Sequence, residues 1–88
     1  MKTVVVHRNK ARFDVLIDRS SIWGNPYEIG VHGTRAEVIE LYRKYLNRSP
    51  ELIGQLESLR GKKLGCWCEP LACHGDVIVD LIEIPTLW

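Results

Sequence analysis

The segment from residue 63 to residue 82 constrains the fold most strongly, because it places two short apolar runs on either side of a cysteine-rich turn. Residues 63–67 are typical of a buried strand, and residues 77–82 indicate a helix that begins near Cys73 or His74. The second run is also compatible with a strand, because short β-branched runs are ambiguous. We favour the helix, since strand, turn and helix bury both runs economically in a short chain.

Two further helices are predicted between the strands. Thr34 and Glu37 match a capping box directly before an apolar-periodic segment, which predicts a helix over about residues 34–47. Ser49 and Pro50 offer a second cap with proline at the first helical position, and a helix from there would end at the following Arg-Gly pair. The apolar spacing in both helices predicts one face in the core.

Two apolar runs near the start of the chain complete the predicted fold. Residues 3–6 and 13–18 indicate strands, the first of them buried in a parallel or mixed sheet. The fold class is therefore α/β, a small Rossmann-like three-layer domain with a short, mainly parallel sheet flanked by helices. We expect residues 1–88 to form a single domain, because this length supports only one modest core.

Composition excludes several classes of protein. Twelve basic and eleven acidic residues give a formal charge of +1, so we expect no broad cationic surface and no nucleic-acid partner. No stretch approaches the roughly 20 apolar residues of a membrane helix, and the start of the chain lacks a signal-peptide apolar region. We therefore expect a cytoplasmic protein without a membrane partner and with reduced cysteines.

The cysteine cluster has three interpretations, of which the first is a zinc-binding interaction module. Cys66, Cys68, Cys73 and His74 are ligands of the types that zinc prefers. The spacing argues against zinc, because the adjacent pair would have to aim both side chains at one ion and the ligand gaps of zinc knuckles are missing. We therefore expect no metal and no cofactor, and the first two cysteines also suit one apolar face of a strand.

The second interpretation is an enzyme that processes a nucleotide or nucleoside. Cys73 would lie in the first turn of a helix, where the dipole and the unpaired N–H groups stabilise a thiolate nucleophile. His74 is a candidate acid or base, but adjacent helical residues diverge by about 100 degrees, so His7 at the end of the first strand is the better partner. A packed cysteine and a capping histidine explain the same residues without catalysis.

The third interpretation, a ligand-binding turn, is the one we prefer. Residues 69–75 lead from a strand end to a helix N-terminus, where the amides of Cys73, His74 and Gly75 would attract phosphate or carboxylate. Gly75 would let a ligand approach the backbone closely, and Asp76 would pair with an arginine or bind a ribose hydroxyl. The candidate ligand contacts are Arg8, Asn9, Arg19, Ser21, Trp23, Gly24, Asn25, Pro26, Trp67, Cys68, Cys73, His74, Gly75 and Asp76.

Two tryptophans have an aromatic role in this interpretation. Trp23 or Trp67 would stack on a flat ring of the ligand. Each is equally well explained as an ordinary core aromatic, because a small core needs large residues.

Several motifs together resemble a known family. They are Ile-Trp-Gly-Asn-Pro-Tyr at 22–27, Gly-Thr-Arg-Ala-Glu at 33–37, Leu-Arg-Gly-Lys at 59–62, Leu-Gly-Cys-Trp-Cys-Glu-Pro at 64–70 and Cys-His-Gly-Asp-Val at 73–77. The combination resembles the domain of unknown function 4326, a family of short phage and bacterial proteins, from Val4 to Ile82. Members usually have Ile-Gly-Arg ahead of the Trp-Gly-Asn-Pro turn, whereas this chain has Asp18 at the middle position.

The family implies no established activity, so the prediction of function depends on the site. We expect binding, and sequestration, of a small phosphate-bearing or nucleotide-derived ligand where the Trp-Gly-Asn-Pro turn meets the Cys-His turn. The alternatives are the enzyme that uses Cys73 and His74 and the zinc-binding module. Because so short a chain supplies only part of an enclosing pocket, we also expect a homo-oligomer.

Overall fold

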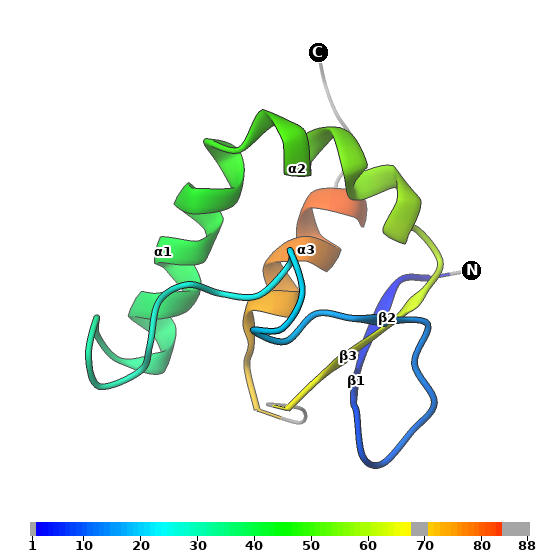
Figure 1. Cartoon of the computed structure of the whole chain (residues 1–88), viewed down its shortest axis with the longest axis horizontal. Helices are drawn as coiled ribbons and strands as arrows, with labels where there is room; N and C mark the ends of the chain where they lie inside the picture. The colour runs from blue at the N-terminus through cyan, green and yellow to red at the C-terminus, as the bar shows by residue number, and fades with distance from the viewer. Residues whose placement is uncertain (1, 68–70, 84–88) are drawn as a thin grey trace.

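The structure is a computed structural model and describes residues 2–67 and 71–83. Three strands form one parallel sheet in the order β1-β3-β2. The strands are β1 (Val4–His7), β2 (Val15–Leu16) and β3 (Lys63–Cys66). The helices are α1 (Arg35–Asn47), α2 (Pro50–Gln55), the 3-10 helix η1 (Leu56–Leu59) and α3 (His74–Glu83). The predicted α/β fold with a short parallel sheet and helices is therefore confirmed (Figure 1).

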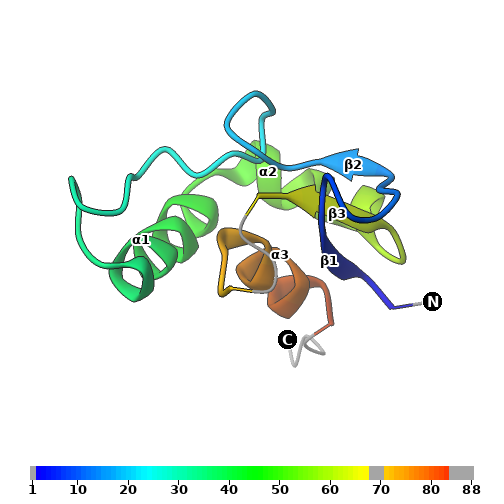
Figure 2. The ribbon, with the colours of Figure 1, turned by 90° about the horizontal axis from the view of Figure 1, so that it is seen from below.

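The helix α3 lies between α1 and the sheet (Figures 1 and 2). It covers the sheet face on which Val5 and Leu64 stand side by side in register, and Leu64 is fully buried there. Phe13 lies over Gly65 on the opposite face of the sheet and stays 38% exposed. One face of the sheet is thus the main core, and the other is only partly covered.

Residues 77–82 are helical, so the strand alternative for this run is wrong. A helix places Val77, Ile78 and Ile82 in the core, where each is at most 5% exposed. The stripe that these three side chains form has the spacing of one helical face. Burial against the sheet therefore decides a pattern that propensity alone leaves ambiguous.

Two predicted elements differ from those observed. The strand expected at 13–18 is reduced to Val15–Leu16, although the amides of Asp14 and Ile17 still bond to β3 carbonyls at 2.7 and 2.9 Å. The helix expected after Ser49 divides into α2 and η1. Ser49 does not cap α2 with its side chain, because its Oγ donates to the Tyr45 carbonyl at 2.8 Å.

The capping box that predicted α1 is present as expected. Thr34 Oγ1 accepts from the Glu37 amide, and Glu37 Oε1 accepts from the Thr34 amide. The helix buries Val38, Tyr42 and Leu46 on one face. None of the helices within residues 2–67 and 71–83 is long and apolar enough to span a membrane.

Candidate ligand-binding site

A pocket lies at the carboxyl ends of the strands, where the turn after β2 meets the first turns of α1 and α3. Its volume is about 260 Å³, which is close to the lower end of the range of small-molecule sites, roughly 300 Å³. It is lined by Asp18, Arg19, Asn25, Tyr27, Ile29, Arg35, Val38, Ile39, Cys66, Trp67, Ala72, Cys73 and His74. Ligands of parallel α/β sheets bind at this edge.

Two arginines bring positive charge to the pocket. Arg19 donates from Nη2 to the Tyr27 carbonyl at 3.1 Å, and its Nη1 lies 3.7 Å from Glu28. Arg35 is the first residue of α1, and its Nη1 donates to the Ala72 carbonyl at 3.0 Å. Because each guanidinium has five N–H donors, both can bind an anion while they keep these contacts.

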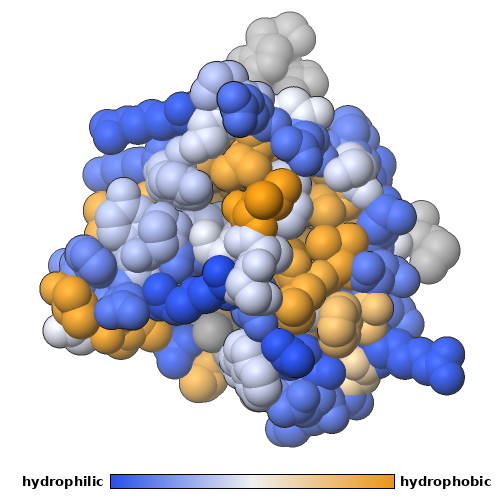
Figure 3. All heavy atoms as spheres, viewed as in Figure 1, coloured by the Kyte–Doolittle hydropathy of each residue, from blue (hydrophilic) through white to orange (hydrophobic). Residues whose placement is uncertain are grey.

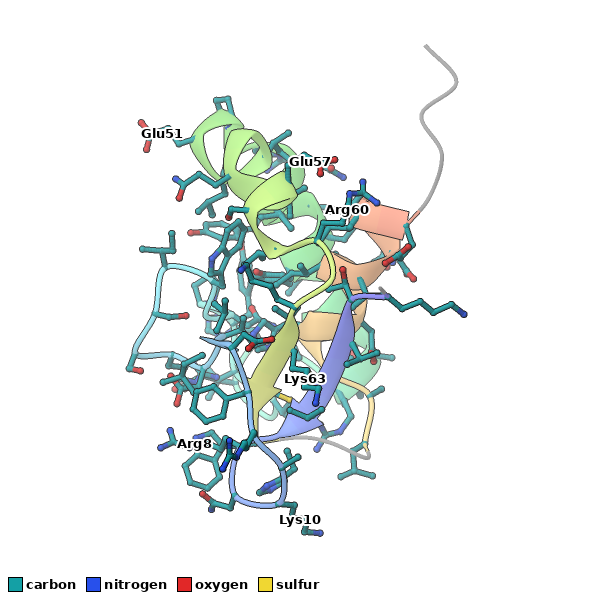
Figure 4. All side chains as sticks on the ribbon, turned by 90° about the vertical axis from the view of Figure 1, so that its right-hand side faces the viewer. Arg8, Lys10, Glu51, Glu57, Arg60 and Lys63 are labelled. Atoms are coloured by element: carbon teal, nitrogen blue, oxygen red, sulfur yellow. The ribbon has the colours of Figure 1, made fainter. Side chains whose placement is uncertain are left out.

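Trp67 forms an aromatic wall beside the end of β3. The Arg8 guanidinium carbon lies 4.5 Å from the Trp67 ring centroid and the same group donates to Asp18 at 2.8 Å. Trp67 Nε1 donates to that carboxylate at 3.3 Å, and the His7 ring meets the Trp67 ring edge-on with centroids 5.9 Å apart. Arg8, which lies at the end of β1 (Figure 4), therefore supports the wall and does not line the pocket.

Asp18 is held in its ionised form. Hydrogen bonds from the Ser20 side chain and backbone are the largest cause that lowers the pKa of Asp18 below its ordinary value, with smaller contributions from Arg8 and Trp67. The side chain is only 11% exposed. The acidic residue at this position therefore balances the charge of Arg8 and fixes the position of the Trp67 wall.

The turn that contains Trp23 borders the pocket, but Trp23 itself is not part of the lining. Trp23 is 4% exposed within the core, and its carbonyl accepts a hydrogen bond from the Tyr42 hydroxyl at 2.8 Å. Ser21 Oγ accepts from the Trp23 amide at 3.2 Å and so shapes the turn. The structure thus assigns Trp23 to the core, and Trp67, which is 51% exposed, is the tryptophan that can stack on a ligand.

The next two residues of this turn also contact the protein. A Cβ at Gly24 would come within 2.6 Å of Arg19 Cα, so glycine allows the two backbone segments to cross. Asn25 donates to the Val38 carbonyl at 3.1 Å and accepts from the Tyr27 amide at 2.9 Å. These bonds join the turn to α1 and place Tyr27 on the pocket lining.

The N-terminus of α3 is capped by its own side chains. Cys73 Sγ accepts from the Gly75 amide at 3.1 Å, and Asp76 Oδ2 accepts from the Cys73 amide at 3.0 Å. This is the reciprocal arrangement of a capping box, with a thiol in place of a hydroxyl. The prediction that the amides of Cys73 and Gly75 attract an anion is therefore wrong, because Asp76 and Cys73 already accept from them. Asp76 therefore serves as a cap of α3.

Gly75 serves the packing of α3 against the sheet. A Cβ at this position would lie 2.8 Å from Ile17 Cδ1 and 2.9 Å from Val5 Cγ2. The expected approach of a ligand to Gly75 is not possible on this side, because the residue is buried where α3 packs against Val5 and Ile17. Because Gly75 lets α3 pack closely on the sheet, the two preceding residues, Cys73 and His74, lie on the pocket lining.

His74 presents a neutral imidazole to the pocket. Its Nε2 lies 2.6 Å from the Ile17 carbonyl, which can only accept, so Nε2 carries the proton. Burial is the largest cause that lowers the pKa of His74 below its ordinary value, and the bond to Ile17 opposes that shift. The Nδ1 lone pair is therefore available, and it lies 3.9 Å from Cys73 Sγ.

Cys66 and Cys73 bring two sulfur atoms together at the pocket. Their Sγ atoms lie 3.3 Å apart, and each residue is at most 2% exposed. The fourth ligand of the zinc alternative, Cys68, lies outside the described residues. Among the side chains that the structure describes, no group of three or more histidine, cysteine, aspartate and glutamate residues could hold a metal ion.

The structure brings together five of the predicted contacts, Arg19, Asn25, Trp67, Cys73 and His74. The other described candidates are not part of the pocket lining and are His7, Arg8, Asn9, Ser21, Trp23, Gly24, Pro26, Gly75 and Asp76. The Asn9 amide donates to His7 Nδ1 at 3.1 Å, on the Trp67 side of the site. The expected pairing of His7 with the Cys-His turn is therefore replaced by packing against Trp67.

Sequence reasoning missed several residues of the lining, namely Tyr27, Ile29, Arg35, Val38, Ile39 and Ala72. A signal existed for Arg35, because the Thr34 capping box places it in the first helical turn. Nothing local shows that this turn lies beside Ala72, which is distant along the chain. Val38 and Ile39 come to the pocket through the tertiary packing of α1.

The fold and the pocket define a class of protein, a small α/β domain with a parallel sheet and a ligand-sized cavity at the carboxyl ends of its strands. Within this class, the chain matches the family described as Domain of unknown function (DUF4326) over residues 4–84, and it belongs to that family. The resemblance in the sequence motifs is thereby confirmed.

Two viral relatives support this assignment. The chain is 44% identical over 83 residues to the "Uncharacterized 12.4 kDa protein in nrdA-td intergenic region" of Enterobacteria phage T4, a match that covers 90% of this chain and 76% of the relative. It is 33% identical over 72 residues to an uncharacterized protein of Acanthamoeba polyphaga mimivirus, covering 73% of this chain and 55% of that protein. No solved structure matches the chain.

Proposed function

We propose that this protein binds and sequesters a small phosphate-bearing or nucleotide-derived ligand in the pocket at the carboxyl end of the sheet. The observation that carries the proposal is the presence of Arg19 and Arg35 on one lining with Trp67. Guanidinium groups bind phosphate oxygens with paired hydrogen bonds, and aromatic rings stack on bases. The anion is thus attracted by side chains rather than by the amides of α3.

The balance of charge favours an anionic ligand. Asp18 also lines the pocket, but Arg8 pairs with it at 2.8 Å. The contact of Arg19 with Glu28 is an exposed pair at 3.7 Å, which contributes little in solvent. Arg19 and Arg35 therefore leave the pocket with excess positive charge, and its modest volume favours one nucleotide or a smaller ligand over a dinucleotide.

Isothermal titration calorimetry with nucleoside monophosphates, the matching nucleosides and inorganic phosphate tests this proposal. Replacing Arg19→Gln or Arg35→Gln should weaken monophosphate binding about tenfold or more, because each change removes a charge-assisted hydrogen bond. Nucleoside affinity should change little. Arg48→Gln is the matched control, since it removes the same charge from an exposed residue after α1. Equal losses in all three variants, or no monophosphate binding at millimolar concentration, would reject the proposal.

An enzyme remains the second candidate, and one observation favours it. Cys73 and His74 both line the pocket, with His74 Nδ1 3.9 Å from Cys73 Sγ and the Gly75 amide donating to the same sulfur. An amide donor at a helix start stabilises a thiolate nucleophile. Turnover that Cys73→Ser abolishes while ligand affinity is kept would favour the enzyme, whereas recovery of the bound ligand unchanged after denaturation supports sequestration.

We propose in addition that the protein acts as a homo-oligomer in the cytoplasm. Apolar side chains gather on the face that carries β2 (Figure 3). Of the apolar residues on either side of β2 in the sequence, Phe13 is 38% exposed and Ile22 is 58% exposed. Exposed apolar patches on small domains often mark interfaces. Light scattering after size exclusion should show a mass above that of one chain, and Ile22→Lys should reduce it to the monomer. A monomeric wild type at high concentration would reject this proposal.

A further inference from the structure

Two rigid elements hold Cys66 and Cys73 in contact. Cys66 is the last residue of β3, where its carbonyl accepts from the Arg8 amide at 2.9 Å. Cys73 directly precedes α3, and its amide is fixed by Asp76 at 3.0 Å. The Sγ atoms lie 3.3 Å apart, compared with about 2.05 Å in a disulfide, so a shift of roughly an ångström would bring them to bonding distance.

The surroundings of Cys73 suit it to react first. The Gly75 amide donates to Cys73 Sγ at 3.1 Å, which stabilises negative charge on the sulfur at the start of a helix. His74 Nδ1 lies 3.9 Å from the same sulfur and has a lone pair that can receive the thiol proton. Although both sulfurs are buried in the fold, both cysteines line the pocket, so a small oxidant reaches them from there.

We propose that Cys66 and Cys73 form a reversible disulfide on the lining of the pocket, so that the protein carries a thiol redox switch. The proposal goes beyond ligand binding and does not depend on it. A disulfide would bond the end of β3 to the start of α3 and would remove both thiols from the lining. Transient disulfides of this kind are the form in which disulfides function in reducing compartments.

Hydrogen peroxide is the oxidant that the size of the pocket admits, and the chemistry balances in two steps. The Cys73 thiolate attacks one peroxide oxygen, which gives a sulfenic acid on Cys73 and hydroxide, and the thiol proton converts that hydroxide to water. The Cys66 thiol then attacks the Cys73 sulfur and displaces a second water. In total two thiols and one peroxide give one disulfide and two waters, and a dithiol reductant reverses the reaction.

The test is to treat the reduced wild-type protein with hydrogen peroxide, block the remaining thiols with N-ethylmaleimide and measure the intact mass. We expect two of the three thiols to be lost and then recovered with dithiothreitol. Chymotrypsin cleaves after Trp67 and Leu71, which separates the three cysteines, so peptide mapping identifies the linked pair. The expected linkage joins Cys66 to Cys73.

Cys68→Ser is the matched control, because it removes the cysteine outside the proposed pair. It should form the same disulfide at the same peroxide concentration, and Cys73→Ser should form none. A linkage that contains Cys68, thiols that stay fully alkylatable, or irreversible sulfinic acid without a cross-link would each overturn the proposal. Stoichiometric zinc that protects the thiols from peroxide would overturn it as well. Mapping the wild type keeps the test valid if a serine variant fails to fold.

Discussion

The first turns of α1 and α3 meet at the pocket, and they use the same capping pattern with different chemistry. In α1, Thr34 Oγ1 accepts from the Glu37 amide at 3.3 Å and Glu37 Oε1 accepts from the Thr34 amide at 2.9 Å. In α3, a thiol and an aspartate replace these groups, with Cys73 accepting from the second helical amide and Asp76 closing the box. The first cap is exposed, whereas the cysteine of the second is buried.

The comparison shows what each helix start can contribute to a site. In both helices the capping box occupies amides that would otherwise attract an anion. The residue after the cap therefore decides whether the helix start carries charge, and it is the cationic Arg35 in α1 but the neutral His74 in α3. We conclude that α1 supplies electrostatic attraction, while α3 supplies a buried sulfur and an imidazole.

The largest expected difference concerns the second residue of each helix. Gly75→Val should destabilise the protein by about 2–3 kcal/mol, because added atoms would overlap Ile17 and Val5 in a packed core. Ala36→Val at the matching position of α1 is exposed and should cost less than about 1 kcal/mol. Urea unfolding of both variants measures the two values. Equal losses would show that α3 does not depend on close contact with the sheet.

The next difference is in pH dependence. Burial lowers the pKa of His74 below its ordinary 6.5, so the unfolded chain binds a proton that the folded chain excludes. The free energy of unfolding should therefore decrease as the pH falls below about 6.5, by up to about 1.4 kcal/mol per pH unit, until the folded-state pKa is reached. The stability that Glu37 gives to the cap of α1 is lost only at lower pH, because the bonds to Thr34 lower the pKa of Glu37 below its ordinary 4.5.

Urea unfolding at several pH values between 7 and 5 measures how the free energy of unfolding changes with pH. His74→Gln should flatten this dependence, because an amide still donates to the Ile17 carbonyl but cannot be protonated in this range. A slope that is unchanged in the variant would mean that other groups determine the acid sensitivity.

A smaller effect distinguishes the two capping atoms. Thr34→Ala should cost about 1 kcal/mol, because it removes the acceptor for the Glu37 amide, and Thr34→Ser should restore most of that stability. At α3, Cys73→Ser should likewise be more stable than Cys73→Ala, since a hydroxyl can still accept from the Gly75 amide. Chemical denaturation checks both pairs. If serine and alanine were equal at position 73, the sulfur would not be acting as a cap.

Local sequence patterns predicted more of the fold than of the site. The Thr34 capping box located the start of α1, and the apolar periodicity of residues 77–82 located α3. These signals are local, because a helix start and a helical face each depend on residues within a few positions. The Cys-x-x-Asp pattern at the start of α3 is also a cap, but a thiol is not among the usual capping groups, so the pattern alone does not identify it as one.

The pocket itself depends on contacts between distant residues. The Arg35 side chain donates a hydrogen bond to the Ala72 carbonyl, and Trp67 Nε1 donates one to the Asp18 carboxylate. The two residues of each pair are distant in the sequence. The role of Gly75 likewise depends on a distant residue, because it packs against Ile17, which directly follows β2. A pattern in one segment cannot show which distant segment packs against it, so the lining could be predicted only in part.

The smallest expected effect concerns an ion pair that joins the outer surfaces of the two helices. Arg43 of α1 lies 3.2 Å from Asp80 of α3, and the Asp80 side chain is 52% exposed. Asp80→Asn should change the free energy of unfolding by less than about 0.5 kcal/mol, because solvent screens exposed pairs. The helices are held instead by buried contacts such as Tyr42 against His74, whose ring centroids lie 5.0 Å apart. Denaturation at low and high salt measures the contribution, and a loss above 1 kcal/mol that salt abolishes would show that charge rather than packing joins α1 to α3.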